Sequence, residues 1–152
     1  MLHHMGIREL GPAETHLAYE AMLELRPNIG AEAEFVAGVN DVQRPAGYRI
    51  VASFDDGDRA ASAAAGFHIG DTLAWGHFLY VEDLVTRESA RGAGHGSGLL
   101  DWVRVEAERN GCDSLQLDSG SQRHDAHRLY LARGYRITGH HFGQVLDEVG
   151  GR

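Results

Sequence analysis

Residues 78–100 read FLYVEDLVTRESARGAGHGSGLL, which is an apolar run, a basic and glycine-rich segment, and a second apolar run. Residues 78–86 are rich in β-branched and aromatic side chains, which predicts a β-strand. Beyond the glycines, apolar residues recur at helical spacing at Leu99, Leu100, Val103 and Ala107. The sequence therefore predicts a strand that leads into an amphipathic helix through a loop over residues 91–96.

The loop between this strand and this helix has the composition of an anion-binding site. Glycines remove side chains where the backbone must approach a ligand, at Gly92, Gly94, Gly96 and Gly98. The first turn of the following helix presents unpaired N–H groups and the positive end of the helix dipole. Arg91 adds a fixed positive charge. Together these features predict that a phosphate or pyrophosphate binds over the loop.

Two common nucleotide-binding loops do not fit the spacing. The dinucleotide pattern GxGxxG could begin at Gly92 and Gly94, but its third glycine would fall where the chain has Ser97. The nucleotide P-loop ends in Gly-Lys-Ser/Thr, and this loop contains no lysine. Both are therefore excluded.

The pattern Arg91-x-x-Gly94-x-Gly96 instead resembles the Arg/Gln-x-x-Gly-x-Gly/Ala loop of the GNAT superfamily of acetyl-CoA-dependent N-acetyltransferases. Residues 126–135, AHRLYLARGY, resemble the family segment Ala-x-x-Leu-Tyr-x-x-x-Gly-Phe/Tyr, and LYVEDLVT resembles its central strand. The resemblance implies an acyltransferase that uses acetyl-CoA as co-substrate and acetylates a primary amine of a small molecule or peptide by direct attack. An acyl-CoA-binding or sensory domain without transfer activity is the alternative.

The order of the predicted elements agrees with that family's fold. Strands are expected at residues 7–10, 48–54, 60–69, 73–75, 78–86, 114–117 and 135–142, with a short extension at 144–149. Helices are expected from Pro12 to Leu25, over 31–39, over 97–110 and from His124 to Gly134, with a loop at 40–46 and turns at 55–58 and 70–71. The resemblance implies an α/β (α+β) fold with a mixed, mostly antiparallel sheet, helices on both faces and splayed central strands.

Composition limits the partners and the location. At 152 residues we expect a single N-acetyltransferase domain over 1–152, and a homodimer stays open. A formal net charge of −8 without a basic run argues against nucleic acid or an anionic membrane and suits an amine substrate. The lone Cys112 excludes an internal disulfide and a cysteine-built zinc site. No apolar run approaches the ~20 residues that span a bilayer, so we expect a cytoplasmic protein.

The resemblance also assigns residues to the binding of acetyl-CoA. Contacts to the pyrophosphate are expected from Arg91, Gly92, Gly94, His95, Gly96 and Ser97. Backbone partners for the pantetheine arm are expected at Leu84, Val85 and Thr86. Where many family members have a cofactor-binding asparagine, this chain has Arg123, so a contact from that position is not carried over.

The catalytic candidates are a tyrosine and the carboxylates of the central strand. Tyr130 matches the tyrosine that protonates the leaving sulfur in many family members, and a core aromatic is the other interpretation. Glu82 and Asp83 should point to opposite faces, because side chains alternate along a strand, so only one can line the acceptor cleft. Glu82 is the first choice to take the amine's proton, Asp83 the second and Asp118 the third.

Four histidines raise the question of a metal site. His124 and His127 share a helical face, and His140 and His141 follow, but strand alternation would separate the last two. No HExxH pattern or cysteine supports a site, so no metal is expected. The acceptor stays open among polyamine, aminoglycoside, amino acid and protein N-terminus.

Overall fold

The computed structural model describes residues 5–55 and 59–146. Within them the chain forms two compact units, the first ending at Leu117 and the second beginning at Asp118. Each unit is described by itself. The expectation of one domain over residues 1–152 stays a prediction.

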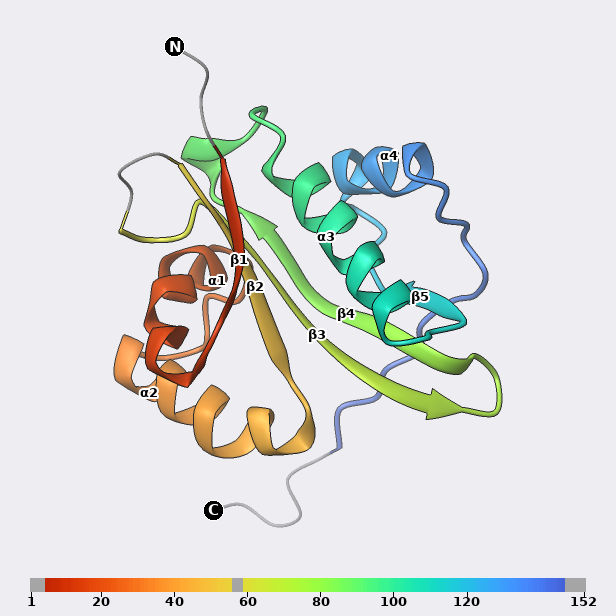
Figure 1. Ribbon diagram of the computed structural model, residues 1–152, viewed down its shortest axis with the longest axis horizontal. Helices are drawn as coiled ribbons and strands as arrows, with labels where there is room; N and C mark the ends of the chain where they lie inside the picture. Colours follow the sequence, from red (N-terminus) through yellow and green to blue (C-terminus); the bar gives the residue numbers. More distant parts are fainter. Residues whose placement is uncertain (1–4, 56–58, 147–152) are drawn as a thin grey trace. The chain divides into compact units, whose positions relative to one another are not determined.

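The first unit is built on a five-stranded sheet in the order β1-β2-β3-β4-β5 (Figure 1). Its strands are β1 Gly6–Leu10, β2 Arg49–Phe54, β3 Ala63–Thr72, β4 Gly76–Thr86 and β5 Ser114–Leu117. The first four strands pair antiparallel, and β5 pairs parallel with β4. A parallel neighbour needs a crossover connection, which α3 (His95–Arg109) supplies.

Helices cover both faces of the sheet. One face carries 3₁₀-helix η1 Pro12–Ala18, α1 Tyr19–Leu25, α2 Glu32–Ala37, π-helix η2 Gly38–Gln43 and 3₁₀-helix η3 Arg44–Ala46. The other face carries α3, where the ring centroid of Trp102 lies 5.9 Å from that of Phe67 on β3 (Figure 1). The short 3₁₀-helix η4 Glu88–Ala90 precedes the glycine-rich loop. The predicted mixed, mostly antiparallel sheet with helices on both faces is confirmed.

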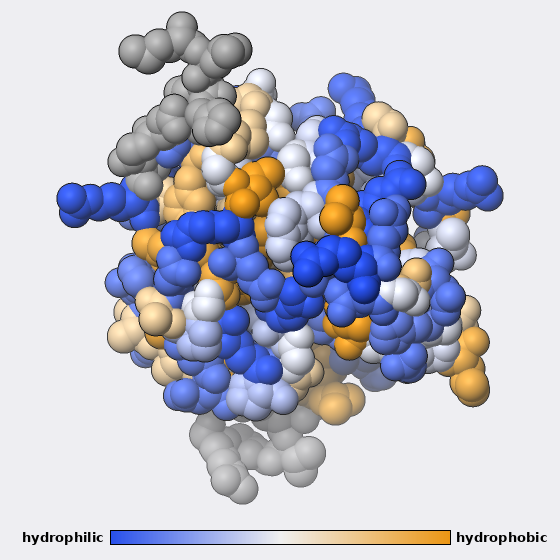
Figure 2. All heavy atoms as spheres, in the orientation of Figure 1, coloured by the Kyte–Doolittle hydropathy of each residue, from blue (hydrophilic) through white to orange (hydrophobic). Residues whose placement is uncertain are grey.

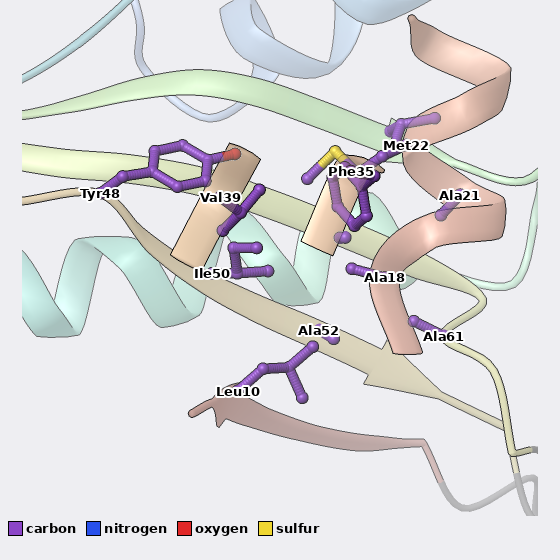
Figure 3. Close-up of a cluster of buried hydrophobic side chains, with 12 residues drawn as sticks. Leu10, Ala18, Ala21, Met22, Phe35, Val39, Tyr48, Ile50, Ala52 and Ala61 are labelled. Atoms are coloured by element: carbon purple, nitrogen blue, oxygen red, sulfur yellow. The ribbon is translucent and has the colours of Figure 1, made fainter. Parts of the chain in front are cut away.

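Apolar side chains fill the space between the sheet and α1 and α2 (Figure 3). This cluster consists of Leu10, Ala18, Ala21, Met22, Phe35, Val39, Tyr48, Ile50, Ala52, Ala61, Ala64 and Val85. Its burial is the main stabilising contribution on this face, because removing apolar surface from water is worth roughly 25 cal/mol per Å². Hydrophilic side chains predominate on the face drawn in Figure 2, with separate apolar patches among them.

Most predicted elements of the first unit are present near their expected positions. The strands expected at 7–10, 48–54, 60–69, 78–86 and 114–117 correspond to β1, β2, β3, β4 and β5. The long helix begins at His95 rather than Ser97, because Gly94, with φ of 92°, ends the loop two residues earlier. The turn expected at 55–58 falls mainly on residues 56–58, which lie outside the described residues.

Residues 40–46 were expected to form a loop, and this prediction is wrong. They continue as helical turns in η2 and η3. Side chains of this segment satisfy backbone oxygens before it: Asn40 Nδ2 donates to Pro12 O at 2.9 Å, and Arg44 Nη2 donates to Leu10 O at 3.0 Å. These contacts between segments far apart in sequence hold the turns in place, and local residue preferences do not reveal them.

The turn expected at Gly70-Asp71 and the strand at 73–75 are also wrong. β3 continues to Thr72, and the chain reverses over residues 73–75. The Trp75 N–H donates to Thr72 Oγ1 at 3.1 Å, and Gly76 has φ of 66°, so the turn is closed by a side chain and a left-handed glycine.

The second unit contains helix α4, His124–Ala132, which ends where Gly134 adopts φ of 87°. The strand expected at 135–142 is wrong, because described residues 135–146 form neither helix nor strand. The large apolar side chains of this segment are largely exposed: Ile137 is 76% exposed and Phe142 is 90% exposed. The extension expected at 144–149 is absent over 144–146, and 147–149 lie outside the described residues. Among helices of the described residues, none is long and apolar enough to span a membrane.

Candidate functional site

The pairing between strands β4 and β5 ends midway along β4. Their pairing runs from Phe78 opposite Ser114 to Val81 opposite Leu117, whereas β4 continues to Thr86. Within the described part of the first unit, residues 83–86 therefore pair with β3 alone. The predicted splay of the central strands is confirmed, and it leaves the backbone of β4 open along one edge.

A β-bulge lies on β4 at the point where the splay begins. Gly66 of β3 faces Asp83 and the next residue, Phe67, faces Val81, so Glu82 is an extra residue in β4. A bulge interrupts the alternation of side chains along the strand. The side-chain directions of residues after Val81 therefore cannot be inferred by counting in twos.

Glu82 and Asp83 reach onto the same face of the sheet as a result. Asp83 Oδ2 accepts a hydrogen bond of 2.8 Å from Tyr48 Oη, and the Tyr48 ring lies where a side chain of Gly66 would stand. Glu82 Oε2 lies 3.2 Å from Nδ1 of His68, two residues along β3 from Gly66 and so on the same face. The prediction that the two carboxylates point to opposite faces is wrong, because it assumed regular alternation.

The Asp83 carboxylate is held on both of its oxygens. Arg26 Nε donates to Oδ1 at 3.0 Å, and Tyr48 Oη donates to Oδ2. Arg26 Nη2 also donates to the backbone oxygen of Glu82 at 3.2 Å, which ties the end of α1 to the bulge. Burial raises the pKa of the Tyr48 phenol well above its ordinary value, and the adjacent Asp83 charge raises it further. Tyr48 is therefore a hydrogen-bond donor throughout the neutral range.

Glu82 is the more accessible carboxylate. Its side chain is 40% exposed, compared with 19% for Asp83. Its neighbour His68 packs between aromatic rings, with ring centroids 5.8 Å from Phe78 and 5.6 Å from Tyr80. Sequence reasoning missed His68 and Tyr48, because their link to the carboxylates depends on strand pairing and on the bulge.

A cavity of about 540 Å³ lies on this face, between the α1–α2 segment and β4. It is lined by Met22, Leu25, Arg26, Pro27, Asn28, Ile29, Glu34, Phe35, Gly38, Val39, Gln43, Tyr48 and Asp83. Met22, Phe35, Val39 and Tyr48 are seen together in Figure 3, between the helices and the sheet. The cavity is therefore a hollow with the Asp83–Arg26 pair in its wall, and its apolar side chains Met22, Phe35 and Val39 belong to the packed core.

Leu84, Val85 and Thr86 occupy the open part of β4. The Val85 side chain is buried in the core, so only its backbone faces the splay. The backbone oxygen of Thr86 lies 3.5 Å from Arg91 Nε, which brings the predicted cationic residue to the end of the strand. The first unit thus brings together the residues predicted for the pantetheine arm and Arg91.

The loop from Arg91 to Gly96 has the predicted form of an anion cradle. Gly92 and Gly94 have φ of 84° and 92°, the left-handed region that favours glycine. A side chain at Gly92 would meet no atom within 4 Å, so the backbone there is open. α3 begins directly after Gly94, and its first turn, with Gly96 and Ser97, presents backbone N–H groups. The loop can therefore receive a diphosphate.

His95 does not point its side chain at this loop. The imidazole is fully buried, with Nδ1 2.7 Å from Ser53 Oγ and Nε2 3.2 Å from Asp55 Oδ1. A contact of His95 with pyrophosphate, which stays a prediction, would therefore come from its backbone and not from its side chain. Its partners lie on and after β2, so they could not be found from the loop motif alone.

Tyr130 and Asp118 belong to the second unit. Tyr130 is buried in α4, with its ring centroid 6.0 Å from that of Tyr135. Burial raises the pKa of the Tyr130 phenol, and Arg123 and Ser119 partly offset this effect. Asp118 Oδ2 lies 3.7 Å from His141 Nδ1.

The histidines of the second unit do not gather around a metal position. The rings of His124 and His127 lie 6.2 Å apart between centroids, and His127 Nε2 contacts the backbone oxygen of Gly120 at 2.9 Å. Across the part of the chain that the structure describes, no three His, Cys, Asp or Glu residues are placed to hold a metal ion.

Comparison with known proteins agrees with the resemblance drawn from the loop. Residues 12–135 match the model of the acetyltransferase (GNAT) family. The N-acetyltransferase YhdJ of Bacillus subtilis is 32% identical over 126 residues, which cover 82% of this chain and 87% of that protein. An aminoalkylphosphonate N-acetyltransferase of Salmonella typhimurium is 36% identical over 66 residues, 43% of each chain.

Solved structures share the fold. A Trypanosoma brucei acetyltransferase superposes with a TM-score of 0.79 at 22% identity, covering 94% of this chain and all of that one. An aminoglycoside N-acetyltransferase in complex with CoA superposes with a TM-score of 0.80 at 16% identity, covering 96% of this chain and 97% of that one. The splayed sheet and the glycine-rich loop described above therefore belong to a fold that binds CoA in a structural relative.

Proposed function

The chain belongs to the GNAT family of acetyltransferases, and on that premise we propose that it acetylates a primary amine of a small molecule or peptide by direct attack of the amine. The resemblance inferred from Arg91-x-x-Gly94-x-Gly96 is confirmed, as is an acetyl-CoA-dependent N-acetyltransferase activity at the level of the family. The observation that carries the proposal is the bulge of β4. It places Glu82 where the pairing of β4 with β5 ends, next to Asp83 in the wall of the cavity.

The residues present fit acetyl-CoA as co-substrate. The open backbone at Gly92 and the N-terminus of α3 offer N–H groups to a pyrophosphate, with Arg91 as the adjacent cation. The free edge of β4 over residues 84–86 offers backbone groups to the pantetheine amides. When bound, the co-substrate supplies the activated acetyl group. Binding along this edge fixes the position of the thioester relative to Glu82.

Glu82 takes the proton of the acceptor ammonium, directly or through water. Its carboxylate is exposed, and its contact in the first unit is a histidine. Asp83 is a weaker candidate because Arg26 and Tyr48 occupy both of its oxygens, so it must give up a hydrogen bond to accept a proton. Asp118 stays the third candidate.

Tyr130 supplies the proton for the departing thiolate. Its raised pKa keeps the phenol protonated at neutral and mildly alkaline pH, as a general acid requires. We further propose one domain over residues 1–152 and a cytoplasmic location. We also propose that the protein has no nucleic-acid or membrane partner, because a net charge of −8 disfavours binding to anionic surfaces. A homodimer stays open.

Isothermal titration with acetyl-CoA, followed by thiol-release assays with a panel of amines, tests this proposal. We expect micromolar binding that weakens tenfold or more in Arg91→Glu, because a repulsive charge then faces the pyrophosphate. Arg104→Glu on the exposed side of α3 is the matched control and should bind normally. Absence of binding by the unmodified protein would refute the proposal. Binding without transfer to any amine would identify a sensory domain instead.

A further inference from the structure

A buried polar cluster lies where the glycine-rich loop joins helix α3, and its side chains have no role in the chemistry described above. It consists of Ser53, Asp55, Ser62 and His95. Ser53, Ser62 and His95 are at most 3% exposed. We propose that this cluster holds the loop in the shape that binds pyrophosphate, so that His95 is a positioning residue for acetyl-CoA. The inference rests on the proposed function and adds a side chain that acts without touching the co-substrate.

The cluster forms at one edge of the sheet. Ser53 pairs with Ala63, and Ala63 pairs with Thr86, so the end of β2, the start of β3 and the end of β4 meet there (Figure 1). The Ser62 N–H donates to the backbone oxygen of Ser53 at 2.8 Å. Ser62 Oγ donates to Asp55 Oδ2, also at 2.8 Å. These bonds hold the end of β2 and the start of β3 together beside the last residue of β4.

Both ends of the glycine-rich loop are attached to this cluster. On the side of β4, the Arg87 N–H donates to the backbone oxygen of Ser62 at 2.9 Å. On the side of α3, the His95 imidazole lies 2.7 Å from Ser53 Oγ through Nδ1 and 3.2 Å from Asp55 Oδ1 through Nε2. The loop therefore runs between two points that are fixed by the same buried groups.

The first turn of α3 is also packed closely against β1. A side chain at Gly98 would place its Cβ 2.7 Å from Ile7 Cδ1, so a larger residue there would have to displace Ile7. This contact sets the distance of the turn from the sheet. The hydrogen bond of His95 is directional, so it sets the rotation of the turn. That rotation decides where the unpaired N–H groups at the start of α3 point.

Serine, histidine and aspartate also form hydrolase triads, in which the serine attacks a substrate. Here Ser53 is 0% exposed and His95 is 1% exposed, so no substrate atom can reach Ser53 Oγ. His95 Nε2 lies beside a carboxylate, which only accepts hydrogen bonds, so we assign the ring proton to Nε2 and the Ser53 hydroxyl to Nδ1. The imidazole thus connects β2 with α3, and its burial fits positioning rather than hydrolysis.

A loop that is ordered in advance binds its ligand more tightly than a mobile one. Gly92 and Gly94 have left-handed backbone, and a side chain at Gly92 would meet no atom of the described residues within 4 Å. Packing therefore does not restrain the loop at Gly92, and glycine loses more backbone freedom than any other residue when it is ordered. Without its anchors, the loop would lose that freedom when pyrophosphate binds, and affinity would fall.

Acetyl-CoA binding by two variants tests the inference. In Ser53→Ala with His95→Leu, both partners of the buried hydrogen bond are removed together, so urea unfolding should show that most of the stability is kept. Isothermal titration should nevertheless show about three- to tenfold weaker binding of acetyl-CoA, because the loop must then be ordered by the ligand. In His95→Asn the amide stands near the position of Nδ1 and can still bond Ser53, so affinity should return to within about twofold of the wild type.

Glu106→Gln is the matched control. Glu106 is another buried polar residue of α3, 7% exposed, and it accepts from Arg49 Nη2 at 2.9 Å near the other end of the helix. Its replacement should lower the free energy of unfolding without changing the loop. Acetyl-CoA affinity should therefore be unchanged in Glu106→Gln, although this variant is less stable than Ser53→Ala with His95→Leu.

Hydrogen exchange of the protein without acetyl-CoA gives a second readout. The amide protons of residues 88–98 should exchange about three- to tenfold faster in Ser53→Ala with His95→Leu than in the wild type, because local opening of the loop costs less free energy. Those of residues 99–109, in the rest of α3, should exchange at the wild-type rate. Glu106→Gln should leave the exchange of residues 88–98 unchanged.

The outcomes separate this inference from the proposed function. Acetyl-CoA affinity that is unchanged in Ser53→Ala with His95→Leu, or that falls equally in Glu106→Gln, overturns the inference and leaves the proposed function standing. Absence of acetyl-CoA binding by the unmodified protein refutes the proposed function. Hydrogen exchange then decides the inference: faster exchange confined to residues 88–98 supports the anchoring of the loop by His95, and unchanged exchange overturns it.

Discussion

Replacing each carboxylate of the β4 bulge by its amide should separate a structural role from a catalytic one. Asp83→Asn keeps the size of the side chain but removes its charge. An amide oxygen can accept from Tyr48 or from Arg26, but its NH₂ group must then face the other donor. Asp83→Asn should therefore mainly affect stability.

The structure sets the magnitude of that effect. The Arg26–Asp83 pair is partly exposed, with the Arg26 side chain 53% exposed, so its loss costs about 0.2–1 kcal/mol. The bond from buried Tyr48 changes from a charged to a neutral acceptor, which costs about 1 kcal/mol more. We expect Asp83→Asn to lower the free energy of unfolding by about 1–2 kcal/mol. Urea denaturation measures this difference at fixed pH.

Glu82→Gln should show the opposite pattern. Its contact with His68 is between side chains that are 40% and 35% exposed, so the free energy of unfolding should change by less than about 0.5 kcal/mol. Loss of a general base should lower kcat/KM by about 10²- to 10⁴-fold, whereas Asp83→Asn should lower it by less than about tenfold. A large loss of kcat/KM in Asp83→Asn with unchanged stability, and an active Glu82→Gln, would refute the assignment.

Three further predictions concern other parts of the chain. Tyr130→Phe should lower kcat by about 10²-fold with little change in acetyl-CoA affinity. Unchanged turnover would show that Tyr130 has a structural role only. Ser53→Ala should cost about 1–3 kcal/mol in urea unfolding, because buried His95 loses the partner of Nδ1; Ser53→Ala with His95→Leu should recover most of it. The hydrogen bond from Arg49 lowers the pKa of Glu106 in the folded state. The stabilisation that this bond gives the fold is therefore fully present above an ordinary carboxyl pKa of about 4.3, and it is lost as the pH falls through the lower folded-state pKa. Comparing unfolding of the wild type and Glu106→Gln from pH 7 to 2 should show the difference vanish at the acid end.

The glycine-rich loop and the strand before it could be predicted from the sequence because their properties are local. Gly92 and Gly94 after Arg91 permit left-handed backbone, and helical spacing after Gly98 marks α3. The prediction of a loop at 40–46 was wrong because the structure of this segment depends on contacts with distant residues. Its helical turns depend on bonds from Asn40 and Arg44 to residues about thirty positions away.

The sequence supplied candidate residues for the site but not their geometry. Sequence reasoning identified Glu82 and Asp83, and regular alternation then placed them wrongly on opposite faces. The bulge is a property of the pairing between β3 and β4, so neither strand reveals it alone. The burial of His95 was missed likewise, since its partner Ser53 lies on β2.

Gly66 determines how Asp83 of the bulge contacts Tyr48, although Gly66 belongs to no sequence motif. It faces Asp83 across the sheet, and the Tyr48 ring occupies the position that a side chain at Gly66 would need. Any larger residue would push Tyr48 away, and the half-buried Asp83 carboxylate would lose a hydrogen-bond donor. Arg26 alone would then hold the carboxylate, and Asp83 could compete with Glu82 for the ammonium. The proposed difference in role between Glu82 and Asp83 therefore depends on glycine at position 66 of the neighbouring strand.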